Sequence, residues 1–418
     1  MIASTSVLRR LNIQALLQHA LATEFFTAAE AMDATGLTRA TILGLCDELI
    51  EVGWLEEIED SRAAGLTTRG RPARRHRLRP DAGVLVGVDA GRRGYTARAA
   101  DLRGITLATA HRELDPDTVD RAQRIATVSA LVDEVLAATG ADGPPLLTVV
   151  GIPAPVDTRG VSPVDVSDFW HLMNPGFAQH LQGPVLVEND ANLTALAELA
   201  RHPEQNLAAL LVGERIGAGL VVDGNLLHGA RGGAGEMRFL DAVLQDDLGA
   251  EGVGSLARRW TLEELATGAD SPALAVIPAG DLTAVDVFTA AAAGDEAARR
   301  VLDRIGERIA RIAAILVSLL GVERIVVAGA VSAAIGPVLA HTREVLPEIA
   351  RAPFPEIVAS TLGREVVVTG AIELALSRLR SAPLEVLRTS PGPAEGNDRA
   401  GSEPPTPART HPREDPAP

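Results

Sequence analysis

Apolar residues recur at helical spacing near the start of the chain and predict three helices. Residues 7–22 read VLRRLNIQALLQHALA, and their apolar positions share one helical face: Leu8, Leu11, Ala15 and Leu16. Thr27 can cap a second helix over residues 28–35, and Thr38 can cap a third over residues 39–53. A tight turn containing Gly36 separates these two helices. The spacing predicts a helix-turn-helix.

The third predicted helix has two contrasting faces. Its apolar face should point into a core: Ile42, Leu45, Leu49 and Val52. Cys46 lies beside this face and is interpreted as a small core residue. The opposite face begins near the helix N-terminus and carries small residues and one arginine: Thr38, Arg39, Ala40, Thr41 and Gly44. Such a face suits a helix that enters the major groove of DNA.

A basic segment follows, between two short predicted strands at residues 54–58 and 77–79. The segment TTRGRPARRHRLRP, residues 67–80, contains six arginines and no acid. Its RGRP core matches the AT-hook pattern, in which glycine lets the backbone lie flat in a narrow minor groove. We predict DNA contacts from five residues here: Arg69, Gly70, Arg71, Arg74 and Arg75. A solvated linker is the alternative interpretation of so basic a segment.

After Pro80, strands alternate with helices in two successive blocks. The first block has strands at residues 84–89 and 146–153, a strand pair over residues 95–111, and a helix over about 117–139. The second block has strands at 207–213, 218–224 and 324–329, with long helices over 285–321. This order predicts an α/β body with two lobes that face a cleft.

Charge is distributed unevenly over the 418 residues, whose formal net charge is −16. Residues 1–60 contain ten acids and three arginines, whereas residues 61–80 contain seven arginines and no acid. An acidic body repels a phosphate backbone, so the arginine block is the part that could grip DNA. All 39 basic residues are arginine, which excludes a phosphate-loop lysine.

Composition also restricts compartment and metal chemistry. One cysteine cannot form an intrachain disulfide or a multi-cysteine zinc site. No apolar run is long enough for a membrane helix, and the N-terminus lacks the features of a signal peptide. We therefore expect a cytoplasmic protein without a membrane partner.

Several motifs together resemble the ROK family, which has the actin-hexokinase fold. They are VGVDAG, GIPAPVD, VENDANLTALAE, GAGLVVDGNLLHGARGGAGE and RIVVAGAVS, and the resemblance covers residues 6–380. That family contains sugar kinases and sugar-responsive repressors, and the repressors carry an N-terminal winged helix-turn-helix. The resemblance implies an α/β fold class: a winged helix-turn-helix followed by a two-lobed actin/hexokinase-like body.

The resemblance also implies a sugar site. Asp190 matches the family aspartate that accepts the proton of a sugar hydroxyl, and Asn189 beside it matches a hydroxyl ligand. Glu236 matches a family glutamate that binds sugar hydroxyls. A carboxylate in a cleft can accept a hydroxyl's hydrogen bond or its proton, so the implied roles are chemically sound.

The nucleotide-binding motifs of the family's kinases are altered in this sequence. The first phosphate loop of the family, Asp-x-Gly-Gly-Thr, is here Asp89-Ala90-Gly91-Arg92-Arg93, and the second, Gly-Thr-Gly, is Gly213-Glu214-Arg215. The Gly-Gly on the adenosine side is replaced by Ala328-Gly329-Ala330. Bulky arginines and a glutamate oppose the approach of backbone N–H groups and of a triphosphate.

The zinc site of the family is lost as well. Its Gly-His is Arg238-Phe239 here, and no Cys-x-Cys-Gly-x-x-Gly-Cys follows. We therefore expect no metal, no cofactor and no catalytic residue. His228 and His171 are interpreted as surface or core residues rather than ligands.

The predicted organisation is a DNA-binding domain with a basic wing (1–80), a ROK effector-binding and dimerisation body (81–380) and a disordered tail (381–418). The predicted function is a sugar-responsive transcriptional regulator, a repressor of carbohydrate metabolism genes. Its expected partners are operator DNA, a sugar or sugar-phosphate effector, and a second copy of the chain as a homodimer or dimer of dimers. Two alternatives remain: an ATP-dependent sugar kinase with a DNA-binding appendage, and a regulator that has lost sugar binding.

Overall fold

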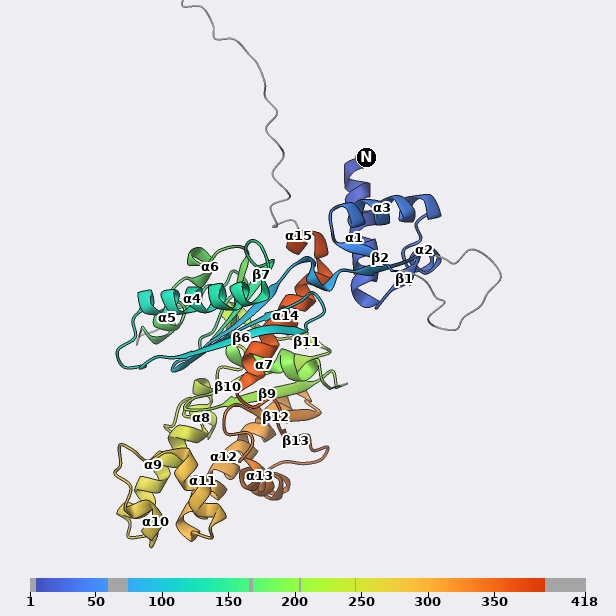
Figure 1. Ribbon diagram of the computed structural model, residues 1–418. Coiled ribbons are helices and arrows are strands. Elements are labelled where there is room, and N and C mark those ends of the chain that lie inside the picture. Colours follow the sequence, from blue (N-terminus) through green and yellow to red (C-terminus); the bar gives the residue numbers. More distant parts are fainter. Residues whose placement is uncertain (1–4, 59–73, 165–167, 203, 245, 388–418) are drawn as a thin grey trace, which may run out of the picture.

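The computed structural model places a small N-terminal domain beside two α/β lobes (Figure 1). It describes five stretches of the chain: residues 5–58, 74–164, 168–202, 204–244 and 246–387. None of the helices in these stretches has the length and apolar character needed to span a bilayer.

The N-terminal domain has the arrangement of a winged helix. Its elements are α1 Thr5–Ala22, β1 Phe26–Thr27, α2 Ala28–Thr35, α3 Arg39–Glu51, β2 Leu55–Ile58 and β3 Arg75–Leu78. Thr27 forms a capping box with Glu30, and Gly36 ends α2 in the left-handed conformation, φ 71°. The Thr38 side chain accepts a hydrogen bond from the Thr41 backbone N–H and so caps α3. The three strands pair in the order β1-β3-β2, so the predicted helix-turn-helix and strand pair are confirmed.

The core of this domain includes Ile42, Leu45, Cys46 and Leu49 from the predicted apolar face of α3. Burial raises the pKa of the Cys46 thiol to about 12, which makes it an unreactive core residue. Val52 was predicted to be buried and is instead 59% exposed, because α3 ends at Glu51 and Val52 is its C-cap. Leu8 and Leu11 are also exposed, so only the second half of α1 follows the predicted pattern.

The first lobe is a five-stranded sheet in the order β6-β5-β4-β7-β8 with helices packed against it. Its elements are η2 Pro80–Ala82, β4 Leu85–Ala90, β5 Gly94–Ala100, β6 Thr106–Glu113, α4 Arg121–Thr139, β7 Leu147–Ile152, α5 Phe169–Met173, α6 Phe177–His180 and β8 Val185–Asn189. Strands β4, β7 and β8 are parallel neighbours, and β5 and β6 are antiparallel additions. The carboxyl ends of the parallel strands β4, β7 and β8 therefore meet at one edge of the sheet.

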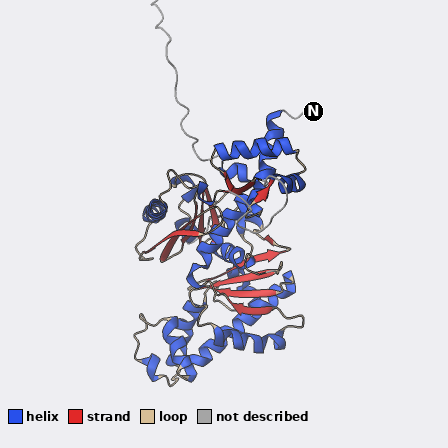
Figure 2. Ribbon diagram, turned by 45° about the vertical axis from the view of Figure 1, so that its right-hand side comes forward, coloured by secondary structure: helices blue, strands red, loops and turns tan. Residues whose placement is uncertain are grey.

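The second lobe repeats this plan, with the strand order β11-β10-β9-β12-β13. Its sheet elements are β9 Leu207–Val212, β10 Ile216–Val222, β11 Asn225–Leu226, β12 Arg324–Ala328 and β13 Glu356–Ala359. Its helices are η3 Ala230–Gly232, η4 Met237–Leu240, α8 Asp241–Leu244, α9 Val253–Ala266, α10 Pro272–Ala275, α11 Ala284–Ala292, α12 Glu296–Leu320, α13 Gly336–Ile349 and η5 Gly363–Glu365. Helix α12 buries a long apolar face in the core. Figure 2 shows the strands of the sheets in red with helices in blue packed around them.

Two helices join the lobes: α7 Asp190–Leu199 and α14 Val366–Ser381. Helix α14 packs on β4 and β7 of the first lobe, α7 packs on β9 and β10 of the second, and the two helices pack on each other. Close approach to α7 requires glycine on both of its neighbours. A Cβ on Gly370 of α14 would lie 1.9 Å from the Leu193 carbonyl oxygen, and one on Gly219 of β10 would lie 2.1 Å from that of Ala191. Both helices start at the cleft.

The far end of α14 reaches the N-terminal domain. Helix α15 Pro383–Leu387 follows it and packs against α1, and Gln18 donates a hydrogen bond to the Ser381 carbonyl. The predicted disordered tail therefore begins too early, because Val386 and Leu387 are buried in the core shared with α1. Residues 388–418 lie outside the described residues.

Candidate ligand-binding site and DNA-facing surface

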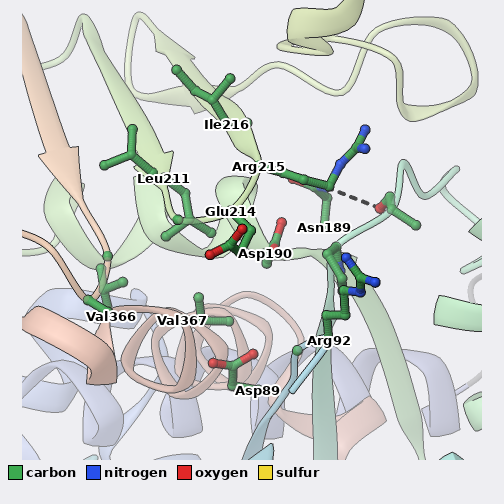
Figure 3. Close-up of a pocket in the computed structure, with 18 of the residues that line it drawn as sticks. Asp89, Arg92, Asn189, Asp190, Leu211, Glu214, Arg215, Ile216, Val366 and Val367 are labelled. Atoms are coloured by element: carbon green, nitrogen blue, oxygen red, sulfur yellow. Dashed lines mark hydrogen bonds between the residues drawn. The ribbon is translucent and has the colours of Figure 1, made fainter. Parts of the chain in front are cut away.

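A cavity of about 370 Å³ opens between the two lobes and receives residues from both. The ends of β4 and β8 supply Asp89 and Asn189, and the start of α7 supplies Asp190 (Figure 3). The β9–β10 turn and the loop before η4 supply Glu214 and Glu236 from the other lobe. The predicted cleft is therefore confirmed, and its size suits a small ligand.

The Asn189 and Asp190 side chains make different hydrogen bonds in the cavity wall. The Asn189 side chain caps α7: its Oδ1 accepts from the Ala191 and Asn192 N–H groups, and its Nδ2 donates to the Ala154 carbonyl. Asp190 Oδ1 accepts one hydrogen bond, from the Ala191 N–H at 2.8 Å. Asp190 is thus the better placed of the two to bind a hydroxyl. Neither ligand role is tested by these contacts, and both stay predictions.

Asp190 is destabilised as an anion. Burial, with the nearby negative charges of Asp89 and Glu236, raises its pKa to about 8. Asp89 is also affected: burial raises its pKa to about 7, although Arg124 opposes the shift. At pH 7 Asp190 is largely protonated and Asp89 is about half protonated, and a protonated carboxyl can both donate and accept hydrogen bonds. The sequence analysis placed Asp89 in the altered first phosphate loop and gave it no ligand role, whereas in the structure it lies near the C-terminal end of β4 in the cavity wall.

A polar contact joins the two lobes two residues before Asp190 in the sequence. Glu188, at the end of β8, accepts a hydrogen bond from the Asn192 side chain and contacts His228 Nε2 at 2.9 Å. This hydrogen bond to Glu188 raises the pKa of His228. His228 lies in the loop after β11, is half-buried and contacts Glu188. The interpretation of it as a surface or core residue did not include this contact. It helps fix the strand end that carries the site.

The altered phosphate loops also line the cavity. The turn after β4 presents Arg92 and Arg93, and Arg92 lies 3.6 Å from the Asp117 carboxylate. In the second loop, Glu214 pairs with Arg258 at 3.1 Å, and the Arg215 guanidinium lies over the Phe169 ring of the first lobe at 5.2 Å from its centroid. Apolar side chains line the remaining wall: Leu211, Ile216, Val366 and Val367 (Figure 3).

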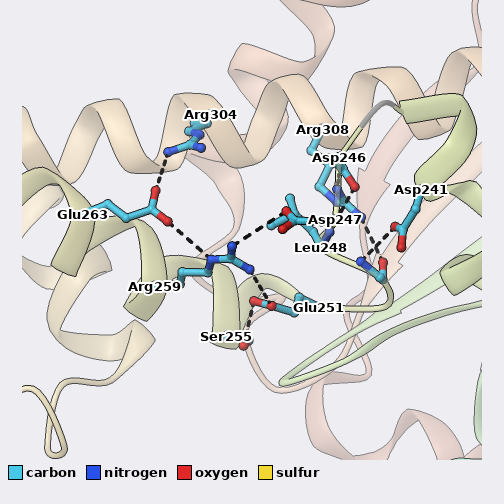
Figure 4. A network of polar contacts seen from close by, with 11 residues as sticks. Asp241, Asp246, Asp247, Leu248, Glu251, Ser255, Arg259, Glu263, Arg304 and Arg308 are labelled. Carbon is cyan, nitrogen blue, oxygen red and sulfur yellow. Dashed lines mark hydrogen bonds and ion pairs between the residues drawn. The ribbon is translucent and has the colours of Figure 1, made fainter.

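The segment in place of the zinc loop is held by ion pairs (Figure 4). Buried Arg308 of α12 bonds the Asp246 carboxylate and donates to the Gly249 carbonyl at 3.0 Å. Arg259 of α9 contacts Glu251 and Glu263. No His, Cys, Asp and Glu cluster suited to a metal ion occurs among the residues described here. The segment does not fit zinc, and guanidinium–carboxylate contacts hold it.

The predicted DNA-facing residues lie together on α3. Thr38, Arg39, Ala40 and Gly44 are exposed, and Thr41 is half-buried. The hydroxyls of Thr38 and Thr41 lie 2.9 Å apart and share a hydrogen bond. Arg39 is exposed and forms no ion pair with an acid of the described residues, so its guanidinium can reach a base edge or phosphate.

The wing arginines that the structure describes contact the domain itself. Arg74 lies 3.3 Å from Glu57, and Arg77 lies 2.6 Å from Glu56. Arg75 stacks over the Phe25 ring at 4.4 Å. These contacts position Arg74 and Arg75 without testing their predicted DNA role. Arg69, Gly70 and Arg71 lie outside the described residues.

Comparison with known proteins adds three findings. The model of a family described as ROK family matches residues 85–378. The xylose repressor of Caldicellulosiruptor bescii is 22% identical over 397 residues, which cover 90% of this chain and 98% of that protein. The glucokinase of Halalkalibacterium halodurans is 30% identical over 252 residues, 53% of this chain and 74% of the enzyme.

A solved structure shares the fold over most of the chain. It is described as a ROK family transcriptional regulator, a homologue of the E. coli MLC protein. It superposes with a TM-score of 0.70 at 20% identity and covers 91% of this chain and 99% of its own. At that identity the likeness shows the fold.

Proposed function

The chain belongs to the ROK family, and from this premise we propose that it is a sugar-responsive DNA-binding regulator, a repressor of carbohydrate metabolism genes, without kinase activity. Residues 1–80 would bind operator DNA, and residues 81–380 would bind the effector and form the homodimer. The single observation that carries the proposal is the winged helix domain packed onto α14 and α15, which connect it to a cavity with altered phosphate loops.

The kinase alternative draws support from the glucokinase relative and from Asp190. It is opposed by the turn that presents Arg92 and Arg93, where the kinase loop needs glycine and threonine, and by Glu214 in the second loop. A coupled assay of ATP turnover across common hexoses separates the two functions. Turnover well above background would establish a kinase and contradict the proposal of a regulator that lacks kinase activity.

The proposed mechanism is a population shift. A ligand that contacts both lobes favours the closed cleft, and α14 runs from that cleft to the DNA-binding domain. Two copies of α3 in a dimer would read a pseudo-palindromic operator with half-sites about one or two DNA turns apart. Selection of binding sites from a random duplex pool tests the DNA-binding half directly, because recovery of no inverted repeat would contradict it.

Replacement of Arg39 by alanine is expected to weaken binding to the selected operator roughly tenfold, because an arginine contact to a base edge is lost. Discrimination at one base pair should relax at the same time. Fluorescence anisotropy on operator variants measures both effects. Arg300→Ala, on α12 and paired with Glu264, is the matched control and should leave affinity unchanged. Equal affinity of the Arg39 variant and the control would place the recognition surface elsewhere.

Arg103 connects the first lobe to the DNA-binding domain. Its guanidinium donates to the carbonyls of Ala20, Leu21 and Thr23 at the C-terminal end of α1, at 2.7 to 3.2 Å. These carbonyls are the unsatisfied groups of a helix end, which a cation stabilises.

Arg103→Met should therefore leave DNA affinity without effector nearly unchanged and reduce the effect of effector on that affinity several-fold. Anisotropy with and without effector measures this coupling, and Arg112→Met, on β6, serves as the control. Full coupling in the Arg103 variant would show that the signal takes another route.

A further inference from the structure

Four arginines line the same cavity from separate turns of the chain. Arg92 and Arg93 come from the β4–β5 turn, Arg215 from the β9–β10 turn and Arg364 from η5. Figure 3 shows the Arg92 and Arg215 side chains on the same side of the cavity as Asn189. Residues 81–418 carry the whole net charge of −16, so a gathering of arginines at the cleft runs against the charge of the body.

These arginines have little internal compensation. Arg92 is exposed, and its contact with the exposed Asp117 is long, at 3.6 Å. Arg215 faces the Phe169 ring rather than an acid. Within the described stretches, neither Arg93 nor Arg364 has an ion-pair partner. The guanidiniums are thus available to a ligand.

The acids of the cavity do not cancel this charge. Glu214 is paired with Arg258. Burial raises the pKa of Asp89 to about 7 and that of Asp190 to about 8, so near pH 7 Asp190 is largely neutral and Asp89 is about half neutral. Glu236, which lines the same cavity, has no ion-pair partner in the described stretches. The cavity therefore carries carboxyl groups that can bind hydroxyls, together with arginines whose charge its acids do not neutralise.

The backbone that presents Arg92 and Arg93 is held in place. Arg124 of α4 is fully buried and donates to the carbonyls of Ala90 and Gly91 at 2.7 and 3.0 Å. The Leu114 N–H donates to the Arg93 carbonyl at 2.9 Å. A turn fixed in this way presents its side chains with a small ordering cost on binding.

We propose that the arginines lining the cavity form a phosphate-binding subsite and that the effector is a phosphorylated sugar, with its hydroxyls at Asp190 and its phosphate bound by arginines of the set Arg92, Arg93, Arg215 and Arg364. Arginine suits this role because its planar donors match phosphate oxygens. The inference rests on the proposed sugar-responsive function and adds the chemical class of the effector.

Calorimetry on the full chain at constant ionic strength tests the subsite, with inorganic phosphate as the first probe. Phosphate should bind the native protein, and Arg93→Gln combined with Arg364→Gln should weaken it by tenfold or more. Arg121→Gln is the matched control, because Arg121 is exposed and pairs with Asp168 outside the cavity lining. No binding, or equal binding to the double variant, would overturn the subsite.

Further arms identify the source of the phosphate. Glucose is compared with glucose 6-phosphate, and N-acetylmannosamine with its 6-phosphate, beside ATP. At least one sugar phosphate should bind at least tenfold more tightly than its free sugar and lose that advantage in the double variant. Equal affinity for each sugar and its phosphate, or ATP binding above every sugar phosphate through the same arginines, would overturn the assignment. DNA binding is measured separately by anisotropy, so its absence would refute the regulator and leave the phosphate result standing.

Discussion

Replacing Asp246 by alanine is expected to destabilise the second lobe by about 3–5 kcal/mol, which is typical when one partner of a buried ion pair is removed. The Arg308 side chain is only 6% exposed, and Asp246 is its sole carboxylate partner in the described chain. Without that carboxylate the guanidinium keeps one hydrogen bond, to the Gly249 carbonyl, and an uncompensated buried charge. The shift of the thermal unfolding midpoint measures the loss.

The adjacent residue provides the control. Asp247 is 91% exposed and lies 3.8 Å from Arg259, so Asp247→Ala should change stability by less than about 0.5 kcal/mol. The combined variant Asp246→Leu with Arg308→Met replaces the pair by apolar side chains and should recover most of the loss. Chelators should leave the midpoint of the native protein unchanged. A small effect of Asp246→Ala, or a large effect of a chelator, would show that the segment is held in another way.

Local signals in the sequence predicted the elements well. Thr27, Gly36 and Thr38 set the helix boundaries as expected because caps and left-handed glycine act within one turn. The strand pair that includes Leu55 and Leu78 followed from alternation. The prediction for Val52 was wrong because the apolar periodicity of the sequence continues past Glu51, where the helix ends.

The site was only partly predictable because it depends on contacts between distant segments. Motif resemblance identified Asp190 and Glu236, and both line the cavity. No local pattern could show that Arg215 and Arg364 share that cavity with Arg92, since they come from three separate turns. The contact of Glu188 with His228 joins two lobes, so a sequence scan treats the two residues independently. The clamp of Arg103 on the end of α1 was missed for the same reason.

Replacing Asp190 by asparagine should stabilise the protein, on the order of 3 kcal/mol at pH 8, while abolishing its response to the sugar effector. The folded-state pKa of Asp190, about 8, lies above its ordinary value of 3.8 because of burial and neighbouring carboxylates. Between these values the unfolded chain has released the proton and the folded chain retains it, so stability falls as pH rises. Asparagine has no such proton, and it keeps an oxygen that can accept from the Ala191 N–H.

The stability gain of Asp190→Asn should therefore be near zero at pH 4, grow through the interval up to pH 8 and then level off. Unfolding midpoints across that range measure it, with Asp133→Asn on the exposed face of α4 as the control that should follow the native profile. DNA affinity without effector should persist, because α3 does not line the cleft and is linked to it through α1 and α14. A gain that is independent of pH would mean that Asp190 is ionised in the folded protein. A loss of DNA binding would instead mean that its role is structural, since an altered ligand site alone leaves the recognition helix intact.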